Sequence, residues 1–344
     1  MKRTEFKNKF DPAPEVEHLR SKVQHLESLL AGKKETSGQI SEDIEQVLAA
    51  VKVAEPPSLL FAPGDVTTSP VTHVVQITDW HIGQRTNPDQ IEEFGAFDYS
   101  IAVQRVERLG TQIIDKTTVA RNSYNIEECH VLGTADWVNG DINDEFIRTN
   151  EFPSPVQAVR AGYLIGSFIR GLSQHFKRVK VDLLTAGNHD RITKKNQAGD
   201  GGLNSWGYIA CEIAKQNLSA CPNVEVRVHT ALSEVVQVSS QRYLIAHGHG
   251  IMGTWGIPFY GIERRKQKEA MARMNMDVSK HFDKIVIGHF HTALNHEHWL
   301  IGGSLTGTSA YDHSQGRHSK AHQTSWFVHP KHGEFDWSRW ALED

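Results

Sequence analysis

The stretch that decides the fold is VTHVVQITDWH, residues 71–81. Residues 71–78 are rich in β-branched side chains, which predicts a buried β-strand. The strand ends at Asp79, and His81 follows two positions later, so both side chains project from the same side of the strand end. In isolation this pair is more typical of an ordinary polar strand end than of a metal site, so the rest of the chain must decide.

Four further motifs repeat this arrangement, each directly after a predicted strand. They are Asp136 in GTADWVNG, Asn188 and His189 in GNHD, His247 in HGH, and His289 and His291 in GHFH. Ligand-binding residues of α/β sheets collect at the carboxyl ends of the strands, so we expect the five motifs to converge. Together they offer carboxylate, imidazole and amide ligands, a mixture that can hold two divalent cations for cleavage of phosphate esters.

The composition limits the other function classes. The 344 residues include 20 histidines, so a lone His-x-His is weak evidence, and only the ordered set of motifs is specific. The three cysteines form no Cys-x-x-Cys pair, which argues for a reducing compartment and against a zinc ribbon. A net charge of −4 means that any contact with nucleic acid must come from local basic patches. No signal peptide or membrane span is recognisable, which predicts a cytoplasmic protein without membrane contacts.

The sequence predicts three parts: a helical extension over residues 1–55, a linker over 56–70 and a catalytic domain over 71–344. In the extension, apolar residues follow the 3, 4, 3, 4 spacing of a heptad seam, and a second amphipathic stripe comes after it. The seam is Val16, Leu19, Val23, Leu26 and Leu30, and the stripe is Ile40, Ile44, Val47, Leu48 and Val51. Two interpretations stay open: a helical hairpin packed on its own domain, or a short coiled coil that forms a homodimer.

From residue 71 onward, predicted strands and helices alternate. Helices are expected at 99–119, 155–176, 204–217 and 261–275, and strands at 71–78, 130–132, 179–185, 224–228, 234–238, 243–246 and 284–287. The remaining chain alternates in the β manner, and Trp326, Trp337 and Trp340 are expected to fill a β-layer core. This order predicts a layered α/β domain whose second half is rich in strands.

The order of the five motifs resembles the calcineurin-like metallophosphoesterase superfamily, over roughly residues 71–310. The resemblance implies a four-layer α/β/β/α sandwich, here with an N-terminal helical extension, and a site for two divalent metal ions. Manganese is favoured, with iron, zinc or magnesium as alternatives. By matching position, the first metal would be bound by Asp79, His81, Asp136 and His291, and the second by Asp136, Asn188, His247 and His289. His189 matches the family's catalytic histidine, which protonates or stabilises the leaving oxygen, and Asp190 would orient its ring.

One departure from the family concerns the turn before the bridging carboxylate. Ala135 stands immediately before Asp136, where the family usually has glycine. Alanine costs little if the backbone keeps a negative φ, which we expect, whereas a positive φ would misplace Asp136. Asn139 and Asp190 also differ from the residues typical of protein serine/threonine phosphatases and purple acid phosphatases, which disfavours both branches.

Basic residues near the motifs suggest the substrate. Arg191, Lys194 and Lys195 follow the GNHD motif directly and are candidate substrate-binding residues. A second cluster lies in the basic helix after HGH and would suit backbone phosphates or simply form a solvated helix face. Nearby aromatic residues could stack on bases, although packing is the commoner role. The second cluster is Arg264, Arg265, Lys266, Lys268 and Arg273, and the aromatics are Trp255, Phe259 and Tyr260.

The favoured function is therefore a metal-dependent phosphodiesterase in which a metal-bridging hydroxide attacks phosphorus, acting as an exonuclease-like DNA nuclease. It resembles the nuclease subunits of the Mre11/SbcD group and related bacteriophage-encoded enzymes, for which the location would be the host cytoplasm. DNA is favoured over RNA as the partner. An ATPase partner is not expected, because the helical segment comes first and residues 310–344 are too few for a capping domain. The alternatives are a phosphodiesterase of small or cyclic nucleotides and a non-catalytic binding module on the same fold.

Overall fold

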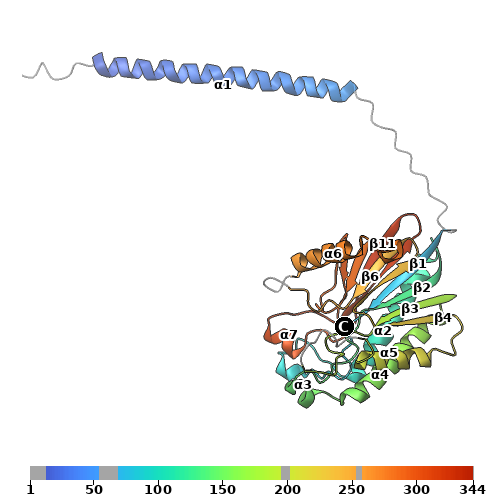
Figure 1. Ribbon diagram of the computed structural model, residues 1–344. Helices are drawn as coiled ribbons and strands as arrows, with labels where there is room; N and C mark the ends of the chain where they lie inside the picture. The colour runs from blue at the N-terminus through green and yellow to red at the C-terminus, as the bar shows by residue number, and fades with distance from the viewer. Residues whose placement is uncertain (1–12, 54–68, 195–201, 253–257, 344) are drawn as a thin grey trace, which may run out of the picture. The chain divides into compact units, whose positions relative to one another are not determined.

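The computed structural model describes residues 13–53, 69–194, 202–252 and 258–343. The chain divides into two compact units, Met1–Pro63 and Gly64–Asp344. In the first unit, α1 (Ala13–Val53) is one uninterrupted helix, which Figure 1 shows in blue. The interpretation of this segment as a helical hairpin is therefore wrong, because residues 31–39 continue the helix instead of forming a turn. Most of the predicted linker, residues 56–68, lies outside the described residues.

The second unit contains a six-stranded sheet in the order β11-β10-β1-β2-β3-β4. Its strands are β1 (Pro70–Ile77), β2 (Asn125–Gly133), β3 (Arg178–Leu184), β4 (Val224–His229), β10 (His322–His329) and β11 (Gly333–Ala341). The strands β1 to β4 are parallel, and β10 and β11 extend the sheet in antiparallel fashion beyond β1. The carboxyl ends of β1, β2 and β3 therefore lie side by side at one edge (Figure 1).

A five-stranded sheet follows in the order β5-β6-β7-β9-β8. Its strands are β5 (Ser233–Val238), β6 (Gln241–Ala246), β7 (Lys284–Ile287), β8 (Leu294–Asn295) and β9 (Trp299–Ile301). The pairs β6–β7 and β7–β9 are parallel, so the carboxyl ends of β6 and β7 are neighbours as well. Each sheet thus presents adjacent strand ends from which polar residues can reach a common site.

Three hydrophobic cores define the layers. The largest lies between the six-stranded sheet and the helices α2 (Tyr99–Ala120), α4 (Ser154–Ser173) and α5 (Trp206–Asn217). A second core, which includes Val74, Leu184 and Val286, joins the two sheets. A third lies between the five-stranded sheet and α6 (Phe259–Arg273). This order of layers confirms the predicted α/β/β/α sandwich.

The predicted elements agree with the structure to within a few residues, except that β2 begins five residues before the predicted strand. Three of its first four residues, Asn125, Glu127 and Glu128, are polar and Ile126 alone enters the core, so periodicity did not reveal this part of the strand. The short helices α3 (Asp144–Thr149) and α7 (Ala310–Ser314), and the 3-10 helices Pro88–Gln90 and Val278–Lys280, were not predicted. Trp326 is buried as expected, whereas Trp337 and Trp340 are only half-buried on the edge strand β11. Within the described residues, no helix combines the length and apolar character needed to cross a membrane.

Candidate metal centre

The loops after β1, β2, β3, β6 and β7 carry the predicted ligands, and backbone hydrogen bonds join neighbouring loops beyond the strands. The backbone N–H groups of Asp79 and His81 donate to the carbonyls of Ala135 and Asp136, at 3.1 Å each. In the second sheet the N–H of Gly288 donates to the carbonyl of His247 at 2.9 Å. These bonds keep the loops in register, so that the side chains of separate motifs come together.

Five of the seven predicted ligand positions share an unusual backbone conformation. Asp79, His81, Asp136, His289 and His291 have φ of 51°, 45°, 53°, 71° and 58°. Left-handed residues other than glycine are strained by roughly 1–2 kcal/mol each and cluster at functional sites. The left-handed turn directs each side chain into the space between the two sheets' strand ends.

The expectation for Ala135 is wrong in both parts. Ala135 has a φ of 71°, in the left-handed region, instead of the negative φ expected for alanine. Asp136 is nevertheless in place: its Oδ2 lies 2.9 Å from Nε2 of His247 and its Oδ1 accepts the N–H of His189 at 2.8 Å. The surrounding bonds fix the turn and hold the alanine in a conformation that glycine would adopt more easily.

Metal-ligating atoms gather in three overlapping groups, each with all its atoms within 4.8 Å of one another. The first group is Asp79–His81–His291, the second is Asp136–His247–His289 and the third is His81–Asp136–His189. Asp136 belongs to two of them. Since one carboxylate has two oxygens, it can serve two cations at once, which is the bridging position that the resemblance implied for this residue.

The first group centres on Asp79. Its Oδ1 lies 3.4 Å from Nε2 of His291 and 3.8 Å from Nε2 of His81, and the two Nε2 atoms are 3.1 Å apart. The other side of the carboxylate accepts the Thr78 hydroxyl at 2.6 Å and the backbone N–H of His289 at 2.9 Å. One ligand atom from each of Asp79, His81 and His291 therefore lies within 4.8 Å of the others, close enough to contact one cation.

The second group joins the two sheets. Nε2 of His247 lies 2.9 Å from Oδ1 of Asn188 and 2.9 Å from Oδ2 of Asp136. Nδ1 of His247 donates to the carbonyl of Thr134 at 2.9 Å, which directs Nε2 toward the oxygens. Such a backbone bond to the far nitrogen is typical of metal-binding histidines. His289 completes the group.

The carboxylates dominate the electrostatics of both groups. Burial lowers the pKa of His247 and His291, but Asp136 raises that of His247 to about 9, and Asp312 and Asp79 raise that of His291 to about 10. Burial and the nearby His247 lower the pKa of His289 to about 3. Cation binding here would displace protons, since a metal and a proton compete for the same imidazole nitrogen.

His189 reaches the centre from the third group, and its orientation differs from the prediction. Nδ1 of His189 donates to the carbonyl of Asn139 at 2.9 Å, and the ring stacks on Phe146 of α3 at a centroid distance of 5.5 Å. The interpretation that Asp190 orients this ring is wrong. Asp190 instead accepts the backbone N–H groups of Asp136 and Trp137 at 2.8 and 2.9 Å, because the left-handed turn points those donors at it. It therefore supports the bridging carboxylate.

Two glycines are required by close approach of the ligands. A Cβ at Gly187 would lie 2.0 Å from Oδ1 of Asp136, and a Cβ at Gly288 would lie 2.3 Å from Oδ2 of Asp79. Both contacts are far below van der Waals distance. Gly187 therefore leaves room for the carboxylate of Asp136, and Gly288 leaves room for the carboxylate of Asp79.

The predicted substrate residues lie beside the centre but are engaged with the protein. Arg191 donates to the carbonyls of Asn188 and Lys194 and, through Nε, to that of Thr193 at 2.9 Å. Lys194 forms an ion pair with Asp144 of α3. Lys195 lies outside the described residues. The role of these residues in substrate binding stays a prediction.

The aromatic residues near α6 divide between two roles. Phe259 stacks on Trp299 at 5.4 Å and so packs against the sheet, whereas Tyr260 is 75% exposed. Trp255 lies outside the described residues. In the basic helix, Arg265 and Arg273 both pair with Glu269, so part of its positive charge is neutralised within the helix.

Sequence reasoning missed Asp312, whose Oδ2 lies 3.5 Å from Nδ1 of His291. The carboxylate is held by a capping box with Ser309 at the start of α7 and has a pKa lowered to about 2, mainly by His291 acting against burial. The Ser-x-x-Asp spacing predicts a helix start. No local signal could have linked it to a histidine in a distant loop.

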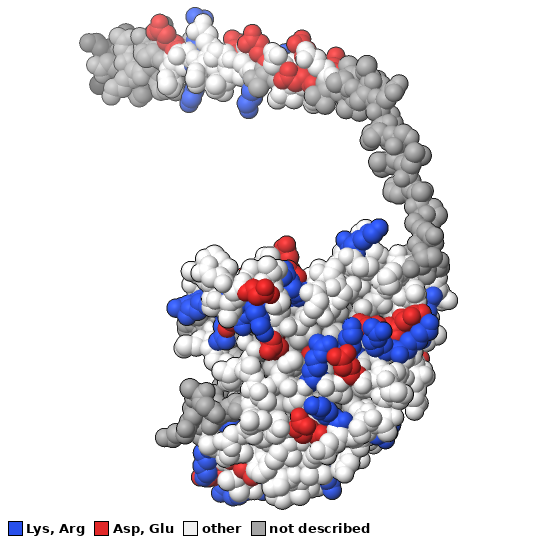
Figure 2. Space-filling model, turned by 45° about the vertical axis from the view of Figure 1, so that its right-hand side comes forward, with Lys and Arg blue, Asp and Glu red and all other residues white. Residues whose placement is uncertain are grey.

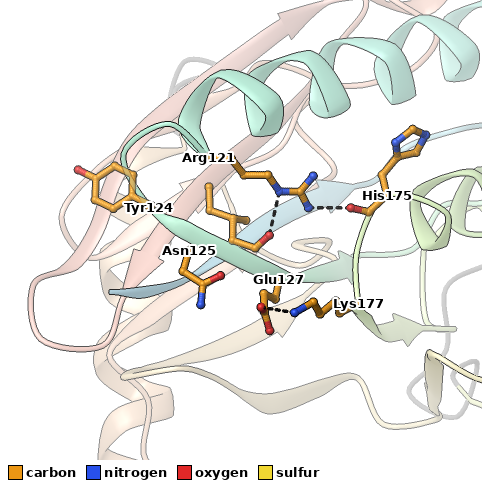
Figure 3. A pocket seen from close by; sticks show the side chains of 7 residues that line it. Arg121, Tyr124, Asn125, Glu127, His175 and Lys177 are labelled. Carbon is orange, nitrogen blue, oxygen red and sulfur yellow. Dashed lines mark hydrogen bonds and ion pairs between the residues drawn. The ribbon is translucent and has the colours of Figure 1, made fainter. Parts of the chain in front are cut away.

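The larger surface hollows lie away from this centre. One of about 450 Å³, shown in Figure 3, is lined by residues at the amino ends of β2 and β3, opposite the ligand loops. Its polar groups bind each other: Arg121 donates to the carbonyls of Ile126 and His175, and Lys177 pairs with Glu127. These groups are satisfied within the protein, which leaves the strand ends as the site with open ligand atoms.

No protein-family model matches the sequence, and no curated protein gives a significant match. Among solved structures, the zinc complex of Vps29 from Entamoeba histolytica has a TM-score of 0.28 and 13% identity over 79% of this chain and 99% of that chain. Vacuolar Protein Sorting 29 from Cryptosporidium parvum has a TM-score of 0.30 and 13% identity, with 79% and 98% covered. A conserved protein of Streptococcus pneumoniae, described as a predicted phosphoesterase, has a TM-score of 0.26 and 10% identity, with 52% and 90% covered. Similarity this low does not identify the chain, whose function has to follow from its own residues.

Proposed function

We propose that this protein is a metal-dependent phosphoesterase that hydrolyses phosphodiester bonds, with DNA as the favoured substrate. The observation that carries the proposal is the position of Asp136 in two ligand groups, one completed by His81 and the other by His247 and His289. A carboxylate that is shared by two sets of imidazoles can hold two adjacent divalent cations.

The donor set fits such cations. Asp79, His81 and His291, with Asp136, would hold one ion, and Asp136, Asn188, His247 and His289 would hold the other. The near approach of imidazole nitrogens to each other and to the carboxylate oxygens leaves lone pairs that only a cation or a proton can satisfy. When bound, two divalent cations activate water near neutral pH and withdraw negative charge from phosphoryl oxygens.

His189 supplies the protein's own acid–base group. Its Nδ1 must carry a proton because the carbonyl of Asn139 can only accept, so Nε2 faces the reacting groups. Burial and the nearby His81 lower the pKa of His189 to about 4, so the ring is neutral at pH 7. An anionic phosphoryl group beside Nε2 would raise this pKa, and the ring could then give a proton to the leaving oxygen.

A nucleic-acid substrate is supported by the positive charge of Arg191 beside the ligand loops, whereas the charge of Lys194 is partly neutralised by Asp144. A broad basic surface is not part of the support. Figure 2 shows positive and negative side chains intermixed on the visible face. The structure also contains surface ion pairs such as Lys177–Glu127 and Lys180–Glu128. We therefore expect the protein to contact the DNA close to the metal centre and over only a few nucleotides of the DNA strand.

The experiment compares hydrolysis of bis-p-nitrophenyl phosphate with that of labelled single- and double-stranded DNA in the presence of Mn²⁺. Wild type should cleave both kinds of substrate, and His189→Ala and Asp136→Ala should lose at least about 100-fold in kcat. His332→Ala and Asp115→Asn, which alter exposed residues away from the centre, serve as matched controls.

The outcomes separate the candidate functions. Cleavage of the small ester alone would move the assignment to a phosphodiesterase of small or cyclic nucleotides. Absence of any cleavage by a wild-type protein that binds two metal ions would contradict the proposal and favour a binding module. Equal activity of His189→Ala and wild type would place the chemistry elsewhere.

A further inference from the structure

The helix α1 exposes a long row of aliphatic side chains. Every described side chain of this helix, over residues 17–35 and 38–46, is exposed. Among them are seven large aliphatic residues, each more than half exposed. Besides Leu29, these are the six residues Leu19, Val23, Leu26, Leu30, Ile40 and Ile44. An apolar surface of this kind marks an interaction site.

The continuity of α1 places all six residues in one heptad register. Reading Leu19 as position d, the seam continues through Lys33 and Ser37 to Ile40 and Ile44 without a change of spacing. The sequence carries the same spacing outward to Val16 at one end and to Val51 at the other. What looks like two short stripes in the sequence is therefore one seam of about five heptads, enough for a stable coiled coil.

The helix also needs a partner for its stability. Gly32 and Gly38 stand in its interior with no atom within 4 Å of their Cβ positions, and each costs about 1 kcal/mol relative to alanine. Isolated helices gain little from propensity alone, and most helical stability in proteins comes from burying an amphipathic face. A seam buried against another helix would supply this stability.

We propose that α1 pairs with α1 of a second copy of this chain as a parallel two-stranded coiled coil. The seam has β-branched Val23 and Ile44 at a positions and leucine at the d positions 19 and 26. These four positions have the distribution typical of parallel dimers, whereas Leu30 at a and Ile40 at d depart from it.

The charges beside the seam select the parallel orientation. Lys22 stands at a g position and Glu27 at the following e position. In a parallel dimer, Lys22 lies beside Glu27 of the partner subunit, and symmetry makes this pair twice. In register, Lys33 faces Lys33 of the partner subunit, which lowers the stability of the pair. A shifted pairing would instead bury this charge against an aliphatic layer, which disfavours the shifted register.

The first test measures the mass of the full chain by sedimentation velocity. Wild type should sediment with twice the chain mass at micromolar concentration. Leu26→Glu/Ile40→Glu should sediment as a monomer, whereas Gln24→Glu/Gln39→Glu adds the same charge away from the seam and should remain a dimer. A monomeric wild type, or a seam variant that still dimerises, would overturn the proposal.

The second test determines the orientation. Cys129 and Cys211 are buried, so a Cys221→Ser background removes the remaining partly exposed thiol. In this background Leu26→Cys should form a disulfide-linked dimer on mild oxidation, because d positions face each other in a parallel pair, and Gln24→Cys should not.

Charge exchange tests the same orientation without a new bond. Lys22→Glu should weaken dimerisation by roughly threefold to tenfold, and Lys22→Glu/Glu27→Lys should restore it. Failure of the double variant to recover, together with no Leu26→Cys cross-link, would contradict the parallel arrangement. None of the three tests depends on hydrolytic activity, so their outcomes are independent of the proposed function.

Discussion

At the scale of single residues, the candidate centre rests on backbone conformations that are costly outside glycine. Ala135 and Asp136 are consecutive left-handed residues. The N–H of Asp136 donates to Asp190, and the carbonyls of both residues accept N–H groups of the loop after β1. These hydrogen bonds offset the conformational strain of the two left-handed residues and set the direction of the Asp136 carboxylate. Small changes in side-chain shape should therefore have large effects here.

Substitution of Ala135 tests the left-handed turn. Ala135→Val should be inactive and less stable by about 2 kcal/mol or more, since a β-branched residue disfavours a φ of 71°. Ala135→Gly should keep activity and change stability by less than about 1 kcal/mol, because the relieved strain offsets the lost buried methyl. Urea denaturation and the hydrolysis assay measure both. Equal behaviour of the two variants would show that the turn is not strained.

Gly187→Ala should displace Asp136 and reduce the amount of bound metal. The added Cβ would contact Oδ1 of Asp136, whose position is fixed by the N–H of His189. Metal content after dialysis against Mn²⁺ should fall by at least one ion per chain. Gly171→Ala is the matched control, since no atom lies within 4 Å of its Cβ position; full metal content in both variants would contradict this role of Gly187.

Asp312→Asn should weaken metal binding by roughly 10- to 100-fold while leaving kcat at saturating Mn²⁺ within a few-fold of wild type. The reason is that Asp312 supports His291 from the side opposite the centre, without touching the reacting groups. Isothermal titration with Mn²⁺ measures the affinity. Asp336→Asn, on an exposed part of β11, controls for the loss of charge. An unchanged affinity for Mn²⁺ would show that the contact between Asp312 and His291 does not support metal binding.

At the scale of elements, a polar network ties three parallel strands together away from the centre. Asp182 of β3 lies 2.6 Å from Nε2 of His130 on β2 and 2.7 Å from Nε2 of His229 on β4, with Arg227 at 3.9 Å. Asp182 and His130 are fully buried. Although burial alone raises it, these histidines hold the pKa of Asp182 well below its unfolded value of 3.8.

This network makes the stability of the sheet depend on pH. The stabilisation by ionised Asp182 is present above about pH 4 and is lost as the pH falls below that value, because the unfolded chain binds the proton first. Asp182→Asn should lower the free energy of unfolding by about 3 kcal/mol at pH 7. The difference from wild type should shrink at pH 3.5, as measured by urea denaturation, with Asp115→Asn as control. A difference that grows toward low pH would contradict the assignment.

At the scale of the whole molecule, the candidate ligands come from both sheets, so bound cations would hold the two halves of the sandwich together. Removal of metal with EDTA should abolish hydrolysis and lower the melting temperature by roughly 5 °C, and Mn²⁺ should restore both. Asp136→Ala should show no such shift. A melting temperature that is independent of metal in wild type would mean that the sheets are joined by packing alone.

Much of the site could be predicted because its chemistry is local in the sequence. The β-branched run predicts a strand, and Asp79 and His81 directly after it are the polar side chains at the end of that strand. Because neighbouring strands are parallel, their carboxyl ends lie side by side, and the polar side chains at these ends come close together. The same local reading found the seam of α1, but it divided the seam in two because the polar residues Lys33 and Ser37 occupy the seam positions between the two apolar stripes.

The sequence by itself determined the strand ends, the order of the motifs and the types of ligand. Only the tertiary structure decided the partners of those ligands: that Asp190 holds the turn of Asp136 and not the ring of His189, and that Asp312 approaches His291. The physical reason is that hydrogen bonds between loops depend on φ and on the packing of the two sheets. Ala135 shows this most clearly, since its left-handed conformation is imposed by bonds from residues far away in the chain.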